Sequence, residues 1–121
     1  MRKKICIIDY GMGNITSIEN SLKYLSVNYD VISNSKNLNK YSHIILPGVG
    51  SFKTAMKNLK KNKLDQKLKH SVKNEEIKIL GICLGMQIMC SLSEEDEREV
   101  GLSWFSAKVE ALKPRKGLNI P

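Results

Sequence analysis

The sequence predicts an α/β fold in which helices cover both faces of an open, mainly parallel β-sheet. Short runs of β-branched and other apolar residues alternate along the chain with stretches whose apolar residues recur every three or four positions, which is typical of βαβ units. The 121 residues, 41% of them hydrophobic and 26% charged, have the length and composition of one globular domain.

The first half of the chain alternates strand and helix. The strands are expected at residues 4–9, 29–33 and 43–46. A turn at residues 10–14 leads into a helix whose apolar residues are expected to face the sheet: Ile15, Ile18, Leu22 and Leu25. The polar residues 33–40 are expected to form a loop, and Pro47 and Gly48 stop the third strand.

The second half continues this alternation. Ser51 can cap a helix that runs to about Lys60, and further helices are expected at residues 64–73 and 84–92. Residues 77–82 form a strand apolar enough to be central in the sheet, and residues 104–109 form another strand. Residues 113–121 read as a loop that closes no element. We therefore expect a partial domain over residues 1–121, with a truncated sheet whose uncovered apolar edge promotes aggregation.

The net charge of +8 is a weak argument for nucleic-acid binding. Arginine occurs only at positions 2, 98 and 115, and the many lysines between residues 53 and 73 have only Phe52 as an aromatic neighbour. The lysines are interpreted as solvated helix faces and the acidic run at residues 94–97 as a solvated loop. No nucleic-acid partner is expected.

Membrane, secretory and metal-binding functions are not indicated. No apolar stretch approaches the roughly 18 residues of a membrane span, and the chain starts without a signal-peptide pattern, so a cytoplasmic protein is expected. Cys6, Cys83 and Cys90 form no CxxC pair and have no histidine at metal-ligand spacing, so neither a disulfide framework nor a metal site is expected. Cys6 and Cys90, the latter in a helix-like run, are expected to be buried.

The glycines at positions 11 and 13 follow the first strand, as in a dinucleotide-binding fingerprint. Thr16 occupies the position of the third glycine, and the second strand does not end in a clean acidic residue. A tight turn between strand and helix, without a cofactor, is therefore expected.

The strongest chemical signal is the segment from Gly81 to Gln87, which reads Gly-Ile-Cys-Leu-Gly-Met-Gln. Cys83 stands where a buried strand ends and a helix begins, with glycines two positions before and two positions after it, which is the spacing of a nucleophile elbow. The sharp turn exposes such a side chain, and the amides at the start of the helix favour its thiolate. The amide of Leu84 is expected to donate to an oxyanion.

A second signal is the loop from Leu46 to Gly50, which reads Leu-Pro-Gly-Val-Gly and follows the third strand. Because the carboxyl ends of neighbouring parallel strands share one edge of a sheet, this loop is expected beside Cys83. Its glycines let main-chain amides approach a ligand closely, so the loop is a second candidate source of oxyanion donors.

The segment around Cys83 resembles the nucleophile motif of the triad-type glutamine amidotransferases, in which a cysteine attacks the side-chain amide of glutamine, forms a glutamyl thioester and releases ammonia. Residues 8–14, 46–52 and 55–56 resemble the glutaminase-subunit family of imidazole glycerol phosphate synthase, in the histidine pathway. The match in order and spacing extends from the first strand to about Val109. It implies a flavodoxin-like sheet and the amino-terminal portion of such a domain.

By this resemblance, Cys83 is the nucleophile toward L-glutamine and the amide of Leu84 serves the oxyanion hole. Contacts to glutamine are implied for Gln87 and for the loop of Gly48, Val49 and Gly50. The resemblance also implies a heterodimer, in which ammonia passes to a (β/α)₈-barrel cyclase subunit. The residues expected near that partner are Gly11, Met12, Gly13 and Asn14.

One departure from the family concerns the catalytic base, a histidine in a His-Pro-Glu segment, because this sequence has no such segment and only His43 and His70 as histidines. His43 opens the third strand, roughly 10 to 13 Å from the carboxyl edge, and His70 lies in a helix that returns to the opposite edge. General acid–base assistance is typically worth about 10²–10⁴-fold, so this chain alone is expected to turn over glutamine negligibly.

Two alternatives stay open. The chain could be a non-catalytic binding module that retains the glutamine and partner surfaces, or a paralogue that supplies ammonia to a sugar-modifying amidotransferase. Coding DNA that continues in frame past Pro121 and carries His-Pro-Glu would favour a fragment over a module. Co-purification of the partner would distinguish the two destinations of ammonia.

Overall fold

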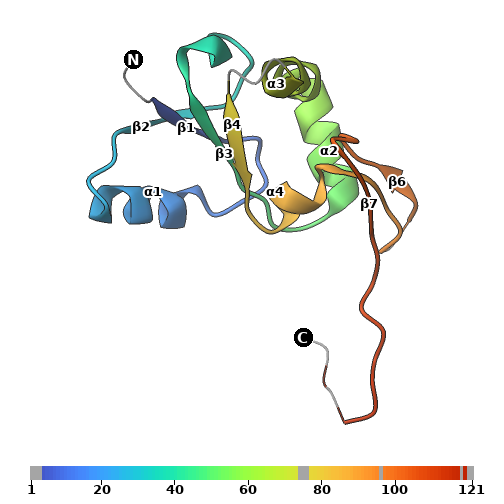
Figure 1. The fold of residues 1–121 in the computed structure, drawn as a ribbon. Helices are drawn as coiled ribbons and strands as arrows, with labels where there is room; N and C mark the ends of the chain where they lie inside the picture. The colour runs from blue at the N-terminus through green and yellow to red at the C-terminus, as the bar shows by residue number, and fades with distance from the viewer. Residues whose placement is uncertain (1–3, 74–76, 96, 118, 120–121) are drawn as a thin grey trace.

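The computed structural model describes residues 4–73, 77–95, 97–117 and 119, and it confirms the expected α/β architecture (Figure 1). The main sheet has the strand order β2-β1-β3-β4, and every pair of neighbours is parallel. Its strands are β1 (Ile5–Ile8), β2 (Tyr29–Ile32), β3 (His43–Leu46) and β4 (Lys78–Gly81). This order corresponds to the first four strands of a flavodoxin-like sheet.

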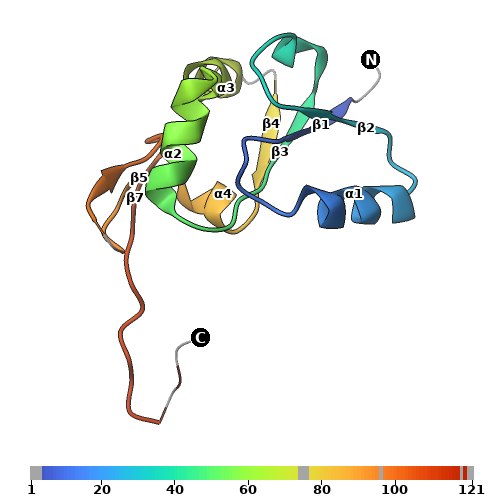
Figure 2. The same cartoon turned by 180° about the vertical axis from the view of Figure 1, so that it is seen from behind.

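Different helices cover the two faces of the sheet, because successive side chains of a strand point to opposite faces. Ile7 and Ile45 pack with Leu22 of α1 (Ile15–Tyr24) on one face. The alternate positions of the same strands pack on the other face with α2 (Phe52–Lys61) and α3 (Leu64–Lys73). Figures 1 and 2 show α1 and α2 on opposite sides of the sheet.

Helices α1 and α2 begin at capping side chains. Asn14 accepts a hydrogen bond from the amide of Ser17 at 3.2 Å at the start of α1, and Ser51 accepts one from the amide of Thr54 at 3.3 Å at the start of α2. The cap at Ser51 and the helix that follows it were both predicted.

The apolar stripe predicted for α1 is confirmed except at its end. Ile15, Ile18 and Leu22 pack toward the sheet, but Leu25 is 64% exposed. The helix ends at Tyr24, and Ser26 has a left-handed backbone (φ +55°), so Leu25 lies at the start of a turn instead of on the helix face that packs on the sheet.

The helix after Cys83 is much shorter than predicted. Helix α4 covers only Leu84–Gln87, and β5 (Cys90–Ser93) replaces the rest of the helix expected to residue 92. Cys90 is buried, as predicted, but it lies on a strand rather than in a helix.

Distant main-chain groups end α4. The carbonyls of Ile88 and Met89 accept hydrogen bonds from the amides of Leu102 at 2.7 Å and Trp104 at 2.9 Å. These carbonyls are therefore not available to continue a helix, and long-range pairing overrides the local helical pattern.

The second sheet contains β5 in the middle, with β6 (Glu99–Val100) antiparallel on one side and β7 (Phe105–Val109) parallel on the other. Strand β7 confirms the strand predicted at residues 104–109. Leu102 is part of the same core as α2 and α3, and Trp104 and Val109 pack against that core. The second sheet therefore shares its interior with the main sheet.

The position of β4 corrects the prediction that residues 77–82 form a central strand. Within the described ranges, β4 pairs with β3 alone and is an edge of the sheet. Leu80 is 58% exposed and Ile82 is 39% exposed. The apolar composition that suggested a central strand is thus left open to solvent, as expected for an uncovered apolar edge.

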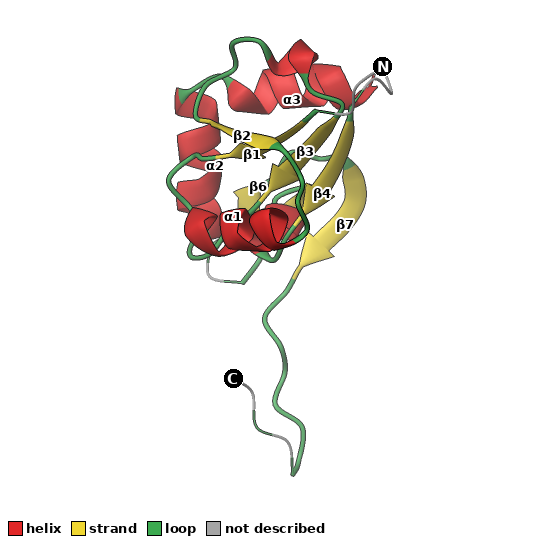
Figure 3. Ribbon diagram, turned by 90° about the vertical axis from the view of Figure 1, so that its left-hand side faces the viewer, coloured by secondary structure: helices red, strands yellow, loops and turns green. Residues whose placement is uncertain are grey.

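After β7 the chain runs away from the rest of the molecule (Figure 3). Residues 110–117 and 119 form no helix or strand, in agreement with the loop predicted at residues 113–121, of which residues 118, 120 and 121 lie outside the described residues. Among the described helices, none is long and apolar enough to cross a membrane.

The open edge of β4 predicts self-association of the chain. Leu80→Lys places a charge on this edge, a device that prevents pairing between strand edges, and is expected to weaken self-association at least about tenfold in analytical ultracentrifugation. Tyr24→Lys is the matched control, because Tyr24 is 89% exposed but lies on α1. An equal effect of the two variants, or a wild-type chain that remains monomeric, would contradict the prediction.

Candidate active site at the carboxyl edge of the sheet

Cys83 lies in the sharp bend between β4 and α4, and its side chain is exposed. Its backbone has φ +55° and ψ −120°, which lies outside the regions that residues other than glycine ordinarily adopt. Backbone strain of this kind costs of order 1–3 kcal/mol and is concentrated at functional sites. The bend therefore presents the thiol as expected for a nucleophile elbow.

The other two thiols are in different surroundings. Cys6 in β1 is 0% exposed and Cys90 in β5 is 9% exposed. Burial, together with the negative charge of Asp30, raises the pKa of the Cys6 thiol to about 12. Cys83 is thus the thiol that a reagent or substrate can reach.

Glycines on both sides of Cys83 allow the bend to close. A Cβ at Gly81 would stand 2.8 Å from the Cα of Met86. A Cβ at Gly85 would overlap the carbonyl oxygen of Leu46. The main chain of α4 therefore lies directly against the end of β3, at a distance that only glycine permits.

The loop that follows β3 lies beside the bend, as predicted. The amide of Leu84 donates a hydrogen bond to the carbonyl of Gly48 at 3.2 Å. Gly48 is buried, whereas Val49 is 56% exposed and Gly50 is exposed with φ +106°. The two segments that the sequence singled out, the bend after β4 and the loop after β3, thus lie side by side.

The hydrogen bond of Leu84 has a chemical consequence that the sequence did not reveal. An amide carries one hydrogen, and in this conformation the carbonyl of Gly48 accepts it. The amide that the sequence predicted as an oxyanion donor is therefore engaged in a main-chain hydrogen bond in this conformation.

The turn at residues 11–14, predicted to face a partner, lies against the same loop. A Cβ at Gly13 would stand 3.4 Å from the side chain of Pro47, and one at Gly50 would stand 3.3 Å from Cε of Met12. Gly11 is exposed with φ +84°, and Asn14 caps α1. The predicted partner surface and the predicted glutamine loop are therefore in contact.

Gln87, the remaining predicted glutamine contact, is the last residue of α4 and is half-buried. The main-chain amide of Gln87 donates a hydrogen bond to the carbonyl of Cys83 at 3.1 Å, which places its main chain one helical turn beyond Cys83.

Tyr10 is a residue of this region for which the sequence suggested no role. It is 3% exposed, and its hydroxyl donates a 2.6 Å hydrogen bond to the carbonyl of Pro47. Burial raises the pKa of Tyr10, so the hydroxyl keeps its proton at neutral pH. The signal in the sequence was an aromatic residue directly after the first strand, which fits many roles.

Both histidines lie away from the thiol, as predicted. His43 is the first residue of β3 and pairs with Lys78, whereas the carboxyl end of β3 pairs with Gly81, about 10 Å further along the sheet. His70 lies on α3, which Figure 1 shows near the start of β4, whereas α4 lies near its end.

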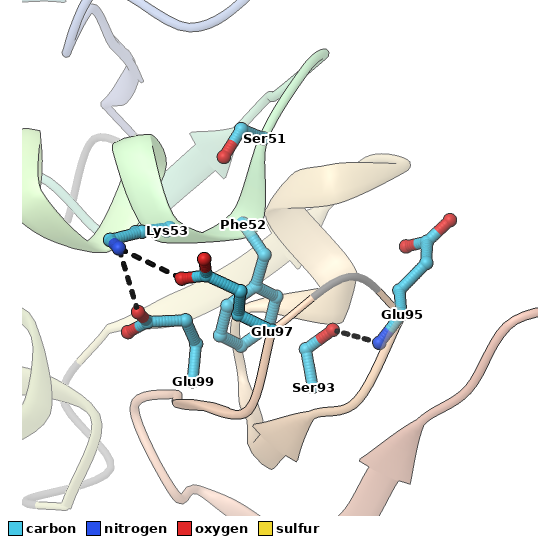
Figure 4. Close-up of a pocket in the computed structure, with 7 residues that line it drawn as sticks. All are labelled: Ser51, Phe52, Lys53, Ser93, Glu95, Glu97 and Glu99. Carbon is cyan, nitrogen blue, oxygen red and sulfur yellow. Dashed lines mark hydrogen bonds and ion pairs between the residues drawn. The ribbon is translucent and has the colours of Figure 1, made fainter.

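A separate pocket of about 240 Å³ lies between the start of α2 and the second sheet (Figure 4). Nζ of Lys53 lies 2.9 Å from a carboxylate oxygen of Glu97 and 3.9 Å from one of Glu99. The side chains of Lys53 and Glu97 are 63% and 72% exposed, so water screens this pair. Within the described ranges, no group of three or more histidine, cysteine or acidic side chains could hold a metal ion. The pocket lining is Ser51, Phe52, Lys53, Ser93, Glu95, Glu97 and Glu99.

The contact between α4 and β3 predicts that Gly85→Ala destabilises the fold strongly. The new Cβ would overlap the Leu46 carbonyl, and that main chain cannot move without breaking β3, so the free energy of unfolding is expected to fall by at least about 3 kcal/mol in urea titrations. Gly13→Ala is the control, because a Cβ there would meet its nearest atom, on the side chain of Pro47, at 3.4 Å, an ordinary contact, and a loss below about 1 kcal/mol is expected. Similar losses in both variants would argue against the contact.

Known proteins are similar to this chain in sequence and in fold. The sequence model of the glutamine amidotransferase class-I family matches residues 6–121. The imidazole glycerol phosphate synthase subunit HisH 2 of Vibrio vulnificus is 42% identical over 120 residues, which are 98% of this chain and 56% of that protein. The corresponding HisH subunit of Bacillus subtilis is 45% identical over 109 residues, which are 90% of this chain and 51% of that protein. The chain thus spans about half the length of the curated relatives it matches.

A solved structure supports the fold. The crystal structure of a glutamine amidotransferase superposes with a TM-score of 0.75 at 18% sequence identity, over 87% of this chain and 55% of the other chain. The matched residues 6–121 include the elbow, the loop after β3 and both sheets. The chain therefore belongs to the class-I glutamine amidotransferase family.

Proposed function

We propose that this chain provides the nucleophile and the glutamine-binding loop of a glutaminase subunit of imidazole glycerol phosphate synthase, an enzyme of histidine biosynthesis. The observation that carries the proposal is the exposed thiol of Cys83, held in a strained bend next to the loop of residues 47–50. The identity of 42% and 45% to relatives with that name favours this subunit over other glutaminases.

The proposed chemistry begins at the sulfur of Cys83. Its thiolate attacks the side-chain amide carbon of L-glutamine. The oxygen of that substrate amide takes up negative charge next to the main-chain N–H of Leu84. The carbon–nitrogen bond then breaks, ammonia leaves with an added proton, and a glutamyl thioester remains until water hydrolyses it. Gln87 and residues 48–50 would hold the rest of the glutamine molecule.

The proposed destination of the ammonia is a (β/α)₈-barrel cyclase subunit, bound in a heterodimer. Residues 11–14 are the proposed contact with that subunit. Their packing against the loop of residues 47–50 supports this, because a partner seated on the turn would lie next to the glutamine site. No cofactor, nucleic acid or membrane takes part in this proposal, and the reaction is assigned to the cytoplasm.

The acid–base steps of the proposed reaction limit the glutamine turnover that this chain could reach on its own. The leaving ammonia needs a proton and the attacking water needs a base, yet His43 and His70 both lie toward the opposite edge of the sheet. General acid–base assistance is worth about 10²–10⁴-fold. The thioester can still form, but its turnover by this chain alone is proposed to be negligible.

The same remoteness of the histidines favours a second candidate, a non-catalytic module that binds glutamine without reacting. The two candidates differ at the first chemical step. A reactive Cys83 acquires the mass of a glutamyl group and releases ammonia once, whereas a binding module does neither.

Mixed with excess glutamine, the chain is expected to release about one ammonia per Cys83 and then to continue at least about 100-fold more slowly than the Bacillus subtilis relative assayed in parallel. A coupled ammonia assay and intact-protein mass spectrometry measure the two phases. Cys83→Ala should abolish the release, whereas Cys90→Ala, a change at a buried thiol, should leave it. Steady turnover close to that of the relative would contradict the proposed inactivity. Binding of glutamine without thioester would favour the module.

A further inference from the structure

The outer sides of α2 and α3 carry a concentration of positive charge. Asp65 is the only acidic residue between residues 52 and 73, and it is half-buried. Both helices turn their apolar residues inward, to a core that includes Leu59 and Leu68. Every lysine of this stretch is exposed, namely Lys53, Lys57, Lys60, Lys61, Lys63, Lys67, Lys69 and Lys73.

Lys53 is the one lysine of this surface that has a counter-charge in the described part of the chain. Its ammonium group pairs with Glu97 and Glu99. The other ion pairs among the described residues are those of Lys108. From residue 57 to residue 73, the lysines therefore form no ion pair within that part of the chain.

These lysines are also close enough to repel one another, because residues three and four apart are neighbours on a helix. Lys57 has Lys60 and Lys61 at this spacing on α2, and Lys69 has Lys73 on α3. The dipole of α2 favours the two lysines of its last turn, but like charges at this spacing destabilise a helix. A bound anion would remove this repulsion.

The two helices meet at a corner and do not form one flat surface. Helices α2 and α3 are in contact and run in different directions (Figures 1 and 3). The exposed Lys63 lies in the turn between them. A flexible chain of negative charges can follow this corner from one helix to the other, whereas a rigid partner would need a hollow of matching shape. The shape therefore favours a linear polyanion.

The residue types on this surface restrict the kind of polyanion. Neither helix contains an arginine, and their one aromatic residue, Phe52, is buried, so groups that stack on bases or read base edges are missing. No large apolar side chain of α2 or α3 is exposed, so neither helix has an apolar face with which to enter a membrane. Lysine ammonium groups are point charges that bind phosphate without a fixed geometry. A phosphate chain without bases fits these properties.

We propose that the outer sides of α2 and α3 bind inorganic polyphosphate, a linear chain of phosphate groups. The lysine ammonium groups lie along the chain and replace the cations that neutralise it in solution. The release of these cations drives binding, so the affinity falls as the salt concentration rises. This surface goes beyond the proposed glutaminase chemistry and does not depend on Cys83.

The test compares two variants that each lose three positive charges. Glutamine replaces the three free lysines of α2 in the test variant, which carries Lys57→Gln, Lys60→Gln and Lys61→Gln. Glutamine replaces exposed lysines outside α2 and α3 in the matched control, which carries Lys23→Gln, Lys113→Gln and Lys116→Gln. Isothermal titration calorimetry with polyphosphate at several salt concentrations measures the Kd of each variant and its dependence on salt.

The test variant is expected to bind polyphosphate at least about tenfold more weakly than the wild type at low salt. The slope of log Kd against log salt concentration should fall by about one for each lysine removed. The control variant should bind within about threefold of the wild type and keep its slope, because the charges it lacks do not lie along the proposed chain.

A second variant and a labelling measurement keep the test independent of folding. Lys69→Gln combined with Lys73→Gln, on α3, should weaken binding in the same direction, and it is available if the α2 variant does not fold. Labelling by iodoacetamide at Cys83, with Cys6 and Cys90 protected, shows that each variant is folded.

Two further probes distinguish polyphosphate from other anionic partners. Single-stranded oligothymidylate with the same number of phosphates and polyglutamate with the same number of charges are each expected to bind at least about tenfold more weakly, because their charges lie further apart. Equal or tighter binding of either probe overturns the choice of polyphosphate. Equal weakening in the test and control variants shows an effect of net charge alone and overturns the surface, and so does a wild-type chain that does not bind polyphosphate.

Discussion

Two stretches of main chain meet at the carboxyl edge of the sheet with no side chain between them, and the site depends on this contact. Gly85 lies against the carbonyl of Leu46, and Gly48 lies within contact distance of Leu84 and Gly85. Such an approach brings backbone donors and acceptors of two strands into one small volume, which side chains would otherwise keep apart. Cys83, whose backbone has φ +55° and ψ −120°, is the residue at which the chain leaves β4 and turns into this contact.

The contact also explains why the amide of Leu84, the predicted oxyanion donor, is engaged in a main-chain hydrogen bond. Backbone amides that lie this close to carbonyls form hydrogen bonds with them unless a ligand competes, because an unpaired buried amide is costly. The amide of Leu84 therefore pairs with the carbonyl of Gly48.

Elements with strong local signals could be predicted from the sequence. Strand β3 ends at a proline and a glycine and α2 begins at a serine cap, so these two elements were placed almost to the residue. The polar helix predicted at residues 64–73 is α3. The elbow could be predicted because its glycines are a direct requirement of its geometry. The loop could be placed beside it because parallel strands put their carboxyl ends at one edge.

The features that could not be predicted depend on contacts between distant residues. The helical pattern after Cys83 gives way because residues 102–104 take the carbonyls of Ile88 and Met89, which no local pattern encodes. Composition suggested that β4 is central, but its position depends on what pairs with its open edge. Tyr10 escaped notice because the meaning of its hydroxyl depends on Pro47, a residue of another strand.

Because of the ion pairs of Lys53, the region around the second sheet responds to salt concentration differently from the carboxyl edge of the main sheet. Lys53 in the first turn of α2 reaches Glu97 and Glu99 across an open pocket, and dissolved salt weakens such exposed pairs. The acidic loop of the second sheet is therefore attached to α2 by a contact whose strength follows ionic strength. The glycine contacts at the carboxyl edge involve no net charge. The backbone geometry around Cys83 is therefore expected to depend much less on salt concentration than the contact between Lys53 and the acidic loop.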